Sequence, residues 1–241
     1  MAGEDRDESG PRTPTSDPEE IERRLQMPLQ LAIATQRTVR RVLPDPVDDA
    51  VLRRCLELAI EAPTGSNSQN WAFLVIRDRD IKAAFGNQYR RAWKLYGGLG
   101  QRLRGGDPAT ARILKSVQWQ VDHFEEIPVI VVCCLRGGPH LPLVPMPALA
   151  TSSHYGSIYP AVQNLLLAAR AAGLAASLIT LPLWSTLHAR RILHMPLTVD
   201  PVCMVPLGWP IGRYGRKKRR EVDALVHLDR WGNRPWEGGT G

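Results

Sequence analysis

Two short polar segments hold the residues of this sequence best suited to binding a small anionic molecule. In Arg37-Thr38-Val39-Arg40, two guanidinium groups and a hydroxyl can hydrogen-bond a phosphate. Thr64-Gly65-Ser66-Asn67-Ser68-Gln69-Asn70 precedes an apolar run, and its amides can read the donor and acceptor edge of a heteroaromatic ring. Together the segments suit flavin mononucleotide (FMN). Taken alone, the first segment could be a surface segment and the second a turn, neither with a binding role, because exposed arginines and polar turns are common.

Helical patterns flank both segments. Asp17-Pro18-Glu19-Glu20 has the residue types of a helix start, and apolar residues at helical spacing predict one helix to about Ala34, just before Arg37. A second helix should begin near Asp48 or Asp49 and stop before Pro63. Residues 80–126 also read as helical, with a glycine-rich break at residues 97–106.

Four short apolar runs predict the strands. They cover residues 71–76, 127–135, 174–181 and 202–207. Residues 157–172 are apolar almost all round, which predicts a deeply buried helix ending at Gly173, and residues 187–194 predict a short helix. Residues 137–147 form a proline-rich loop, either a lid or plain surface. Four strands separated by helices without regular alternation favour a layered α+β or mixed α/β fold.

Composition places the chain among ordinary globular proteins. We expect a disordered tail over residues 1–16 and one domain over residues 17–241 of this 241-residue chain. No apolar run approaches the roughly 18 residues of a membrane span, and no secretory signal is evident, so a cytoplasmic protein is expected. Cys55, Cys133, Cys134 and Cys203 lie in apolar contexts and read as inert core thiols.

The net charge of +7 raises the question of nucleic-acid binding. The basic excess concentrates at residues 213–220, and a local cluster is weaker support for that class than a whole basic face; it could equally hold one phosphate. No nucleic-acid partner is therefore expected. The six histidines have no metal-ligand spacing, so no metal is expected either.

Four blocks of the sequence resemble the nitroreductase-like FMN-dependent oxidoreductases, a group that includes iodotyrosine deiodinases. The blocks are Arg37-Thr38-Val39-Arg40, the helix and turn of residues 56–71, the apolar helix of residues 157–169 with Gly173-Leu174, and Pro206-Leu207-Gly208-Trp209-Pro210. The blocks occur in the family's order, and the resemblance as a whole covers about residues 20–230. The resemblance implies an α+β fold, a three-layer α/β/α sandwich with a mixed central sheet, and a homodimer with FMN at the subunit interface.

The resemblance also implies roles for particular residues. Arg37, Thr38 and Arg40 would hold the phosphate and the ring edge, and Lys218 or Arg219 would reach the phosphate, although Arg216 and Lys217 crowd the same place. The flavin would be lined by Thr64, Gly65, Ser66, Asn67 and Gln69. The segment Leu178, Ile179 and Thr180 would pass beside the ring near N5. No side chain is expected to act as the catalytic group, because the flavin carries the chemistry.

The implied activity is transfer of electrons from NADH or NADPH through flavin N5 to a small electrophile such as a nitroaromatic compound or a quinone, by a ping-pong mechanism. The alternatives are a flavin-holding or regulatory protein without turnover, and a reductive dehalogenase. Asn70 stands where the family commonly has proline, and Thr38 and Thr64 where serine is commoner. Residues 90–123 and 137–154, which would shape the substrate pocket, match nothing in the family pattern. A C-terminal arm carrying Trp231 and Trp236 would wrap a partner subunit or pack on its own chain.

Overall fold

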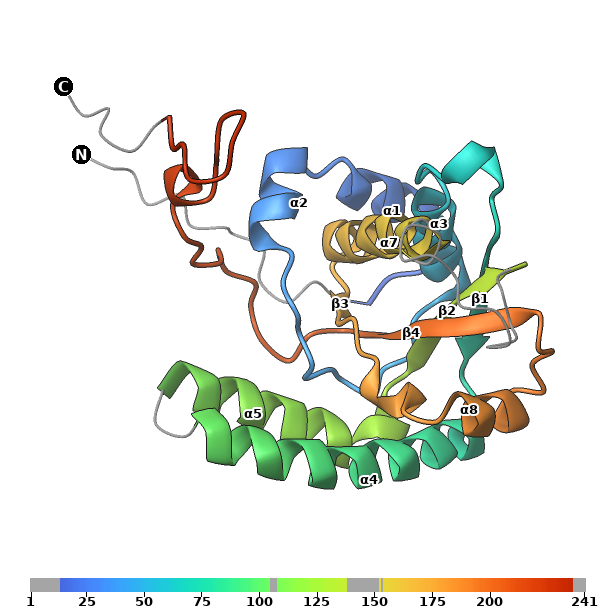
Figure 1. The fold of residues 1–241 in the computed structure, drawn as a ribbon. Coiled ribbons are helices and arrows are strands. Elements are labelled where there is room, and N and C mark those ends of the chain that lie inside the picture. Colours follow the sequence, from blue (N-terminus) through green and yellow to red (C-terminus); the bar gives the residue numbers. More distant parts are fainter. Residues whose placement is uncertain (1–13, 105–107, 138–151, 153, 236–241) are drawn as a thin grey trace.

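The computed structural model describes residues 14–104, 108–137, 152 and 154–235 (Figure 1). The expected tail, apart from its last three residues, the loop of residues 138–147 and Trp236 lie outside this part of the chain. In chain order the elements are α1 (Pro18–Leu25), α2 (Leu29–Thr35), α3 (Asp49–Ala59), η1 (Gly65–Asn67), β1 (Trp71–Ile76), α4 (Arg79–Arg104), α5 (Pro108–Asp122), η2 (Phe124–Glu126), β2 (Val129–Arg136), α7 (Ile158–Ala172), β3 (Ala175–Ala176), η3 (Leu181–Leu183), α8 (Thr186–Ile192), β4 (Val199–Gly208) and η4 (Val222–Ala224).

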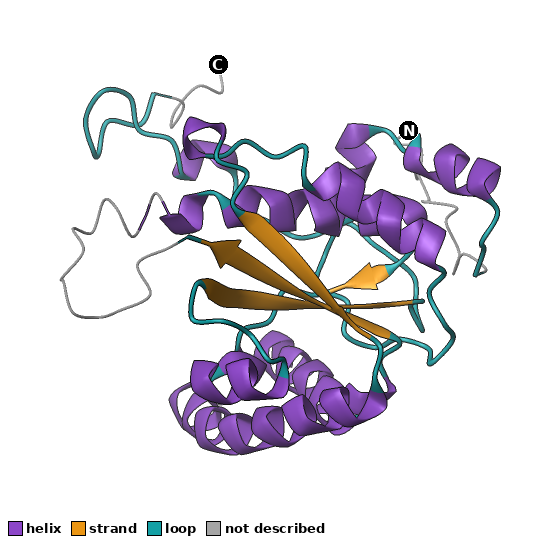
Figure 2. Cartoon of the chain, turned by 90° about the vertical axis from the view of Figure 1, so that its right-hand side faces the viewer, coloured by secondary structure: helices purple, strands orange, loops and turns teal. Residues whose placement is uncertain are grey.

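A four-stranded sheet forms the middle layer, in the order β1-β2-β4-β3. Figure 2 shows it between helices on both faces, with α1, α2, α3 and α7 on one side and α4, α5 and α8 on the other, as Figure 1 labels them. The expected α+β class and its layers are therefore present. The expectation of a mixed sheet was wrong for the described strands, since every pairing among them is antiparallel. The α4–α5 hairpin returns the chain to the end where β1 finished, so β2 must run the opposite way.

The central strand β2 is buried on both faces, as its continuous apolar sequence predicts. Val129, Val131, Cys133 and Leu135 belong to the core cluster that includes α7, whereas Ile130, Val132 and Cys134 belong to the cluster that includes Phe85 and Phe124. One strand thus supplies both cores, which fixes the helix layers relative to the sheet.

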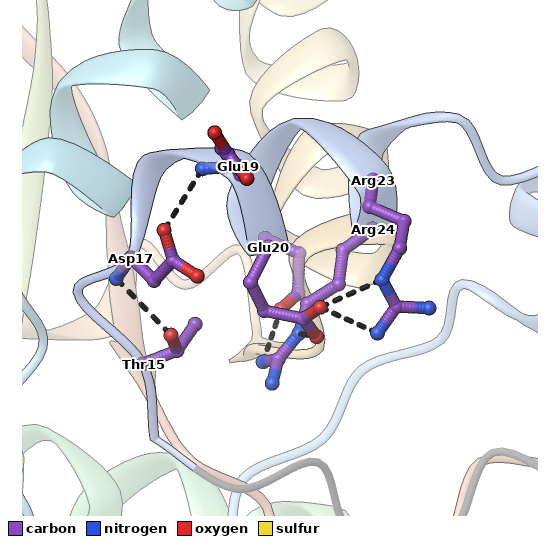
Figure 3. Close-up of polar contacts among 7 residues, drawn as sticks. Thr15, Asp17, Glu19, Glu20, Arg23 and Arg24 are labelled. Atoms are coloured by element: carbon purple, nitrogen blue, oxygen red, sulfur yellow. Dashed lines mark hydrogen bonds and ion pairs between the residues drawn. The ribbon is translucent and has the colours of Figure 1, made fainter.

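The N-terminal region forms two helices instead of the one expected. The start is as predicted: the Asp17 carboxylate accepts from the Glu19 N–H over 3.1 Å, and Glu20 pairs with Arg23 and Arg24 within the helix (Figure 3). The break comes at Pro28, which has no N–H to donate and whose ring clashes with a preceding carbonyl in a continuous helix. This second helix, α2, delivers the chain to Arg37.

The long helical region also differs from expectation. Helix α4 continues through Gly97 and Gly98 as far as Arg104, so the predicted break was wrong for residues 97–104, while its last two residues lie outside the described part of the chain. A Cβ at Gly97 would lie 3.1 Å from Cε2 of Trp93, so the glycine makes room for the indole. The Trp93 indole N–H donates to Oε1 of Gln118 over 2.8 Å and joins α4 to α5. Packing between the two helices therefore outweighs the low helix propensity of glycine.

The expected strand over residues 174–181 is mostly irregular. Only Ala175–Ala176 forms a ladder with β4, followed by an isolated bridge between Ile179 and Met204. The outer carbonyl of Ala176 accepts instead from the backbone N–H of Val39 over 3.1 Å. The edge of the sheet is thus occupied by the segment that carries Arg37 and Arg40.

Candidate functional site

A cavity of about 650 Å³ lies between three parts of the chain. One is the segment after α2, the second is a face of α5, and the third is the arm after β4. The lining residues are Gln36, Arg37, Thr38, Arg40, Arg112, Ile113, Ser116, Arg216, Lys217, Lys218 and Arg219. The structure therefore brings together Arg37, Thr38 and Arg40 with Lys218 and Arg219, although nearly 180 residues separate the two groups in the sequence. This cavity is called the cationic cavity below.

The cationic cavity carries a strong positive field. None of its described lining residues is acidic, while seven are arginine or lysine. Lys217 donates from Nζ to the carbonyl of Ile33 over 2.9 Å, and burial together with the charges of Arg219 and Arg37 lowers its pKa. Like charges held this close repel each other, so an anion bound among them would be strongly favoured.

Arg40 combines a place in the cavity lining with a buried, unsatisfied donor atom. Its Nε is buried and has no hydrogen-bond partner within the described residues. Burial lowers the pKa of Arg40, opposed by the nearby phenol of Tyr89, whose own pKa burial raises to about 12. A buried cationic donor without a partner is costly, and a ligand oxygen placed there would remove that cost.

The backbone fixes the two charged segments beside each other. The N–H of Leu43 donates to the carbonyl of Trp209 over 2.8 Å, and the N–H of Ile211 donates to the carbonyl of Arg41 over 3.2 Å. An isolated bridge pairs Val42 with Pro210. The sequence block of residues 206–210 therefore serves to hold the arm against the segment that carries Arg40.

The second polar segment forms the short helix η1 and a strained turn. Ser66, Asn67 and Gln69 have φ values of 52°, 51° and 45°, a region that costs non-glycine residues on the order of 1 kcal/mol or more. The Gln69 N–H donates to Oγ1 of Thr64 over 3.1 Å, and the Gly65 N–H donates to Oγ of Ser157 over 3.4 Å. Ser66, Asn67 and Gln69 are exposed. The turn thus presents polar groups outward from a fixed backbone.

The two polar segments lie at opposite ends of the sheet. Trp71, next to the turn, pairs with Leu135, which pairs with Asp200 at the start of β4. Val42, next to Arg40, pairs with Pro210 beyond the end of β4. Ten residues of strand separate those ends, which is roughly 30 Å at about 3.3 Å per residue. One chain therefore does not bring Arg40 and Asn67 to the same small ligand.

A smaller cavity of about 400 Å³ lies at the end of the sheet that carries the turn. It is lined by Ser68, Gln69, Asn70, Arg136, Gly137, Thr198 and Val199, none of which lines the cationic cavity.

The remaining predicted site residues lie near the first segment without lining its cavity. Ile179 is buried and bridges to Met204, Leu178 is half-buried and Thr180 is exposed. They follow Ala176, the hydrogen-bond partner of Val39. Their proximity to a flavin ring stays a prediction.

Four lining residues were missed by the sequence reasoning: Gln36, directly after α2, and three residues of α5. Arg112 and Ser116 are four residues apart and so share one face of the helix, with Ile113 beside them. The spacing of the Arg112 cation and the Ser116 hydroxyl could have suggested an anion-binding face on this helix. Nothing in the sequence, however, indicated that this face lies next to Arg37.

The cysteines are buried, and the possible metal-ligating side chains of the described residues do not cluster. All four cysteines are buried and unpaired. Within the part of the chain that the structure describes, no three His, Cys, Asp or Glu side chains gather as a metal site, and no helix is long and apolar enough to cross a membrane. Trp231 is 90% exposed and stacks on His227 with ring centres 4.1 Å apart, so in the chain described here it does not anchor the arm.

Comparison with known proteins agrees with this architecture. Residues 33–209 match the model of the nitroreductase family. A protein of Methanothermobacter thermautotrophicus named as an NADH dehydrogenase/NAD(P)H nitroreductase is 24% identical over 83% of this chain and 86% of its own. An NADH dehydrogenase of Thermus thermophilus is 31% identical, but only over 42% of this chain and 35% of its own length. An oxidized iodotyrosine deiodinase solved with FMN and 3-iodo-L-tyrosine superposes with a TM-score of 0.64 at 22% identity, covering 86% of this chain and 100% of the other.

Proposed function

The chain belongs to the nitroreductase family, and on that premise we propose that it is an FMN-dependent oxidoreductase. Bound FMN would supply the redox chemistry, a ping-pong transfer of electrons through N5 from NADH or NADPH to a small electrophile such as a nitroaromatic compound or a quinone. The observation that carries the proposal is the cationic cavity, which Arg40, with its buried and unpartnered Nε, helps to line.

The residues of the cationic cavity fit the anionic half of FMN. Arg37 and Arg40 offer guanidinium donors, Thr38 a hydroxyl, and Lys218 and Arg219 further positive charge from the arm. These side chains would hold the phosphate, while Arg40 would also stabilise negative charge on the pyrimidine edge. The protein thereby orients the ring and favours its reduced, anionic form.

A second copy of the chain would supply the other half of the site. Thr64, Gly65, Ser66, Asn67 and Gln69 lie at the far end of β4 from Arg40, a separation longer than an FMN molecule. In a homodimer, the turn of one subunit can face the cationic cavity of its partner. Leu178, Ile179 and Thr180 would then pass beside the ring near N5. The apolar residues of α7 are mostly buried within one chain, whereas Leu29 and Ile33 on α2 are exposed and are consistent with burial on association.

Reductive dehalogenation is a second candidate, favoured by the likeness to a structure that holds both FMN and 3-iodo-L-tyrosine. It would use the same cofactor site and differ only in the acceptor. A flavin-holding protein without turnover remains the alternative from another class.

The test is a visible spectrum of the purified protein loaded with FMN and titrated anaerobically with NADH and then with NADPH. Bleaching by either nucleotide, followed by reoxidation with a nitroaromatic compound or a quinone, supports the oxidoreductase. Reoxidation by iodotyrosine with release of iodide supports the dehalogenase. Bound flavin that stays oxidised with both nucleotides indicates the holding protein, and no flavin binding overturns the proposal.

A further inference from the structure

One face of α5 forms a separate wall of the cationic cavity. Arg112, Ile113 and Ser116 lie on it, and Gln120 continues the same face one turn later. Gln120 is 1% exposed and donates from Nε2 to Oγ of Ser177 over 2.9 Å. Because Ser177 follows the Ala176 that holds Val39, this bond fixes the α5 wall relative to the segment that carries Arg37 and Arg40.

The cationic cavity holds more positive charge than one FMN phosphate needs. A phosphate monoester carries at most about two negative charges near pH 7. The lining has seven cations, and those assigned to the flavin come from the segment after α2 and from the arm. Arg112 comes from α5, is exposed, and forms no ion pair within the described residues. It is therefore available to a second anion in the same cavity.

The chemistry of the α5 wall matches a nucleotide. Arg112 offers a planar fork of donors to phosphate oxygens, and the hydroxyl of Ser116 can donate to the same group. Ile113, between them, is 55% exposed, which gives an apolar surface on which a base or nicotinamide ring can lie. On one helix face, the cation and the hydroxyl can bind the phosphate of a phosphorylated heteroaromatic ligand, and the apolar side chain can pack against its ring.

We propose that Arg112 and Ser116 bind a phosphate of the reduced nicotinamide dinucleotide, with Ile113 against one of its rings. The inference rests on the proposed function and specifies how the electron donor is recognised. Arg112 selects the donor by its phosphate groups and takes no part in the hydride transfer. The phosphate is either the 2′-phosphate of NADPH or the pyrophosphate shared by both dinucleotides, and the experiment separates the two.

The experiment compares Arg112→Ala and Ser116→Ala with Lys115→Ala in the FMN-loaded protein. Lys115 is exposed on the same helix and does not line the cavity, so its removal takes away one charge without touching the site. Anaerobic flavin reduction is followed with NADPH, NADH and 1-benzyl-1,4-dihydronicotinamide, a hydride donor without phosphate. Arg112→Gln repeats the test should the alanine variant fold poorly, and the 450 nm absorbance measures flavin content.

Arg112→Ala should raise the KM for the phosphorylated donor about tenfold, the loss expected for one charge-assisted hydrogen bond, with flavin content and kcat near wild type. Ser116→Ala should raise it by a smaller factor. The phosphate-free donor should react equally with all variants. An effect on NADPH alone assigns the 2′-phosphate, and equal effects on NADPH and NADH assign the pyrophosphate.

The inference is overturned if Arg112→Ala and Arg112→Gln behave like Lys115→Ala, or if the phosphate-free donor is slowed as much as NADPH. In both cases the wild type still binds and reduces flavin, so the proposed function stands. A wild-type protein that takes up no flavin would instead remove the proposed function, and this inference with it.

Discussion

The Arg170 guanidinium lies over the ring of Tyr214, with its carbon 4.1 Å from the ring centre. Arg170 is 1% exposed near the end of α7 and donates from Nε to Oγ1 of Thr35 over 2.8 Å. The Tyr214 hydroxyl donates to the carbonyl of Leu174, and burial raises its pKa, so this donor persists at alkaline pH. A buried cation thus ties the last helical turn before Arg37 to the start of the arm that carries Arg219.

Replacing Tyr214 should loosen that arm. Tyr214→Leu removes both the ring over Arg170 and the hydroxyl, which together are worth about 1–3 kcal/mol, so FMN should bind roughly fivefold to a hundredfold more weakly. Tyr214→Phe keeps the ring and should lose less. Quenching of flavin fluorescence measures the Kd, and a Tyr214→Leu protein with wild-type affinity would show that the arm is held by other contacts.

Arg40 and its neighbour Arg41 provide a matched pair. Arg40 lines the cationic cavity with a buried Nε, whereas Arg41 is exposed and outside the lining. Arg40→Ala, and likewise Arg219→Ala, should give a folded protein that purifies with markedly less FMN, while Arg41→Ala should retain it. The ratio of absorbance at 450 and 280 nm reports occupancy. Equal occupancy in Arg40→Ala and Arg41→Ala would remove Arg40 from the flavin site.

The predictable parts of the fold are the helices and strands whose position is determined by residues within or next to the element itself. The continuous apolar runs at β1 and β2, the Asp17 and Asp48 helix caps and the left-handed Gly173 after α7 all follow from local chemistry. Pro28 was a visible breaker that the longer apolar period obscured. The shortness of β3 and the continuity of α4 depend on Val39 and Trp93, contacts from outside each element, which periodicity does not contain.

Gly208 should be essential to the cationic cavity although it lies outside it. A Cβ at this position would lie 2.9 Å from Cβ of Val42 and 3.0 Å from Cγ of Pro128, so alanine must push apart the arm and the segment beside it. Gly208→Ala should lower the melting temperature by several degrees and reduce FMN content. Gly212→Ala, with nothing within 4 Å of the added carbon, is the control. Normal flavin content in Gly208→Ala would mean that the arm after β4 and the segment that carries Val42 can move apart without loss of FMN binding.

The cysteines should be unreactive until the protein unfolds. Burial raises the pKa of Cys55 and of Cys134 to about 12, against an ordinary value of about 8.5. At pH 8 native protein should therefore consume almost no thiol reagent, and urea-denatured protein should consume four equivalents. Rapid modification of the native protein would place a thiol at the surface.

The buried thiols of Cys55 and Cys134 should make the folded protein less stable as the pH rises. Their folded pKa lies above the unfolded one, so their contribution to stability is complete below about pH 8.5 and is lost as the pH rises toward 12. The urea midpoint should fall above about pH 9, and it should fall less in a Cys55→Ala protein. A midpoint that stays constant to pH 11 would contradict this.

The candidate site was predictable in its chemistry and not in its layout. Arg37, Arg40 and the basic arm were identifiable because few roles other than anion binding need so many cations together. The amides of Asn67 and Gln69 predicted a second part of the flavin site, and its role stays a prediction, since these residues lie outside the cationic cavity. That these groups lie at opposite ends of β4 follows only from strand register, and the contribution of Arg112 follows only from how α5 packs.

The placement of Arg40 and Asn67 at the two ends of one strand has a genetic consequence. In the proposed homodimer each active site takes its cation from one subunit and its amide from the other. Arg40→Ala and Asn67→Leu homodimers should both be deficient in flavin. A hybrid of the two variants should recover one complete site, because both defects fall in the other. Co-expressed, the two damaged alleles should therefore complement each other, with up to half of wild-type activity per hybrid dimer.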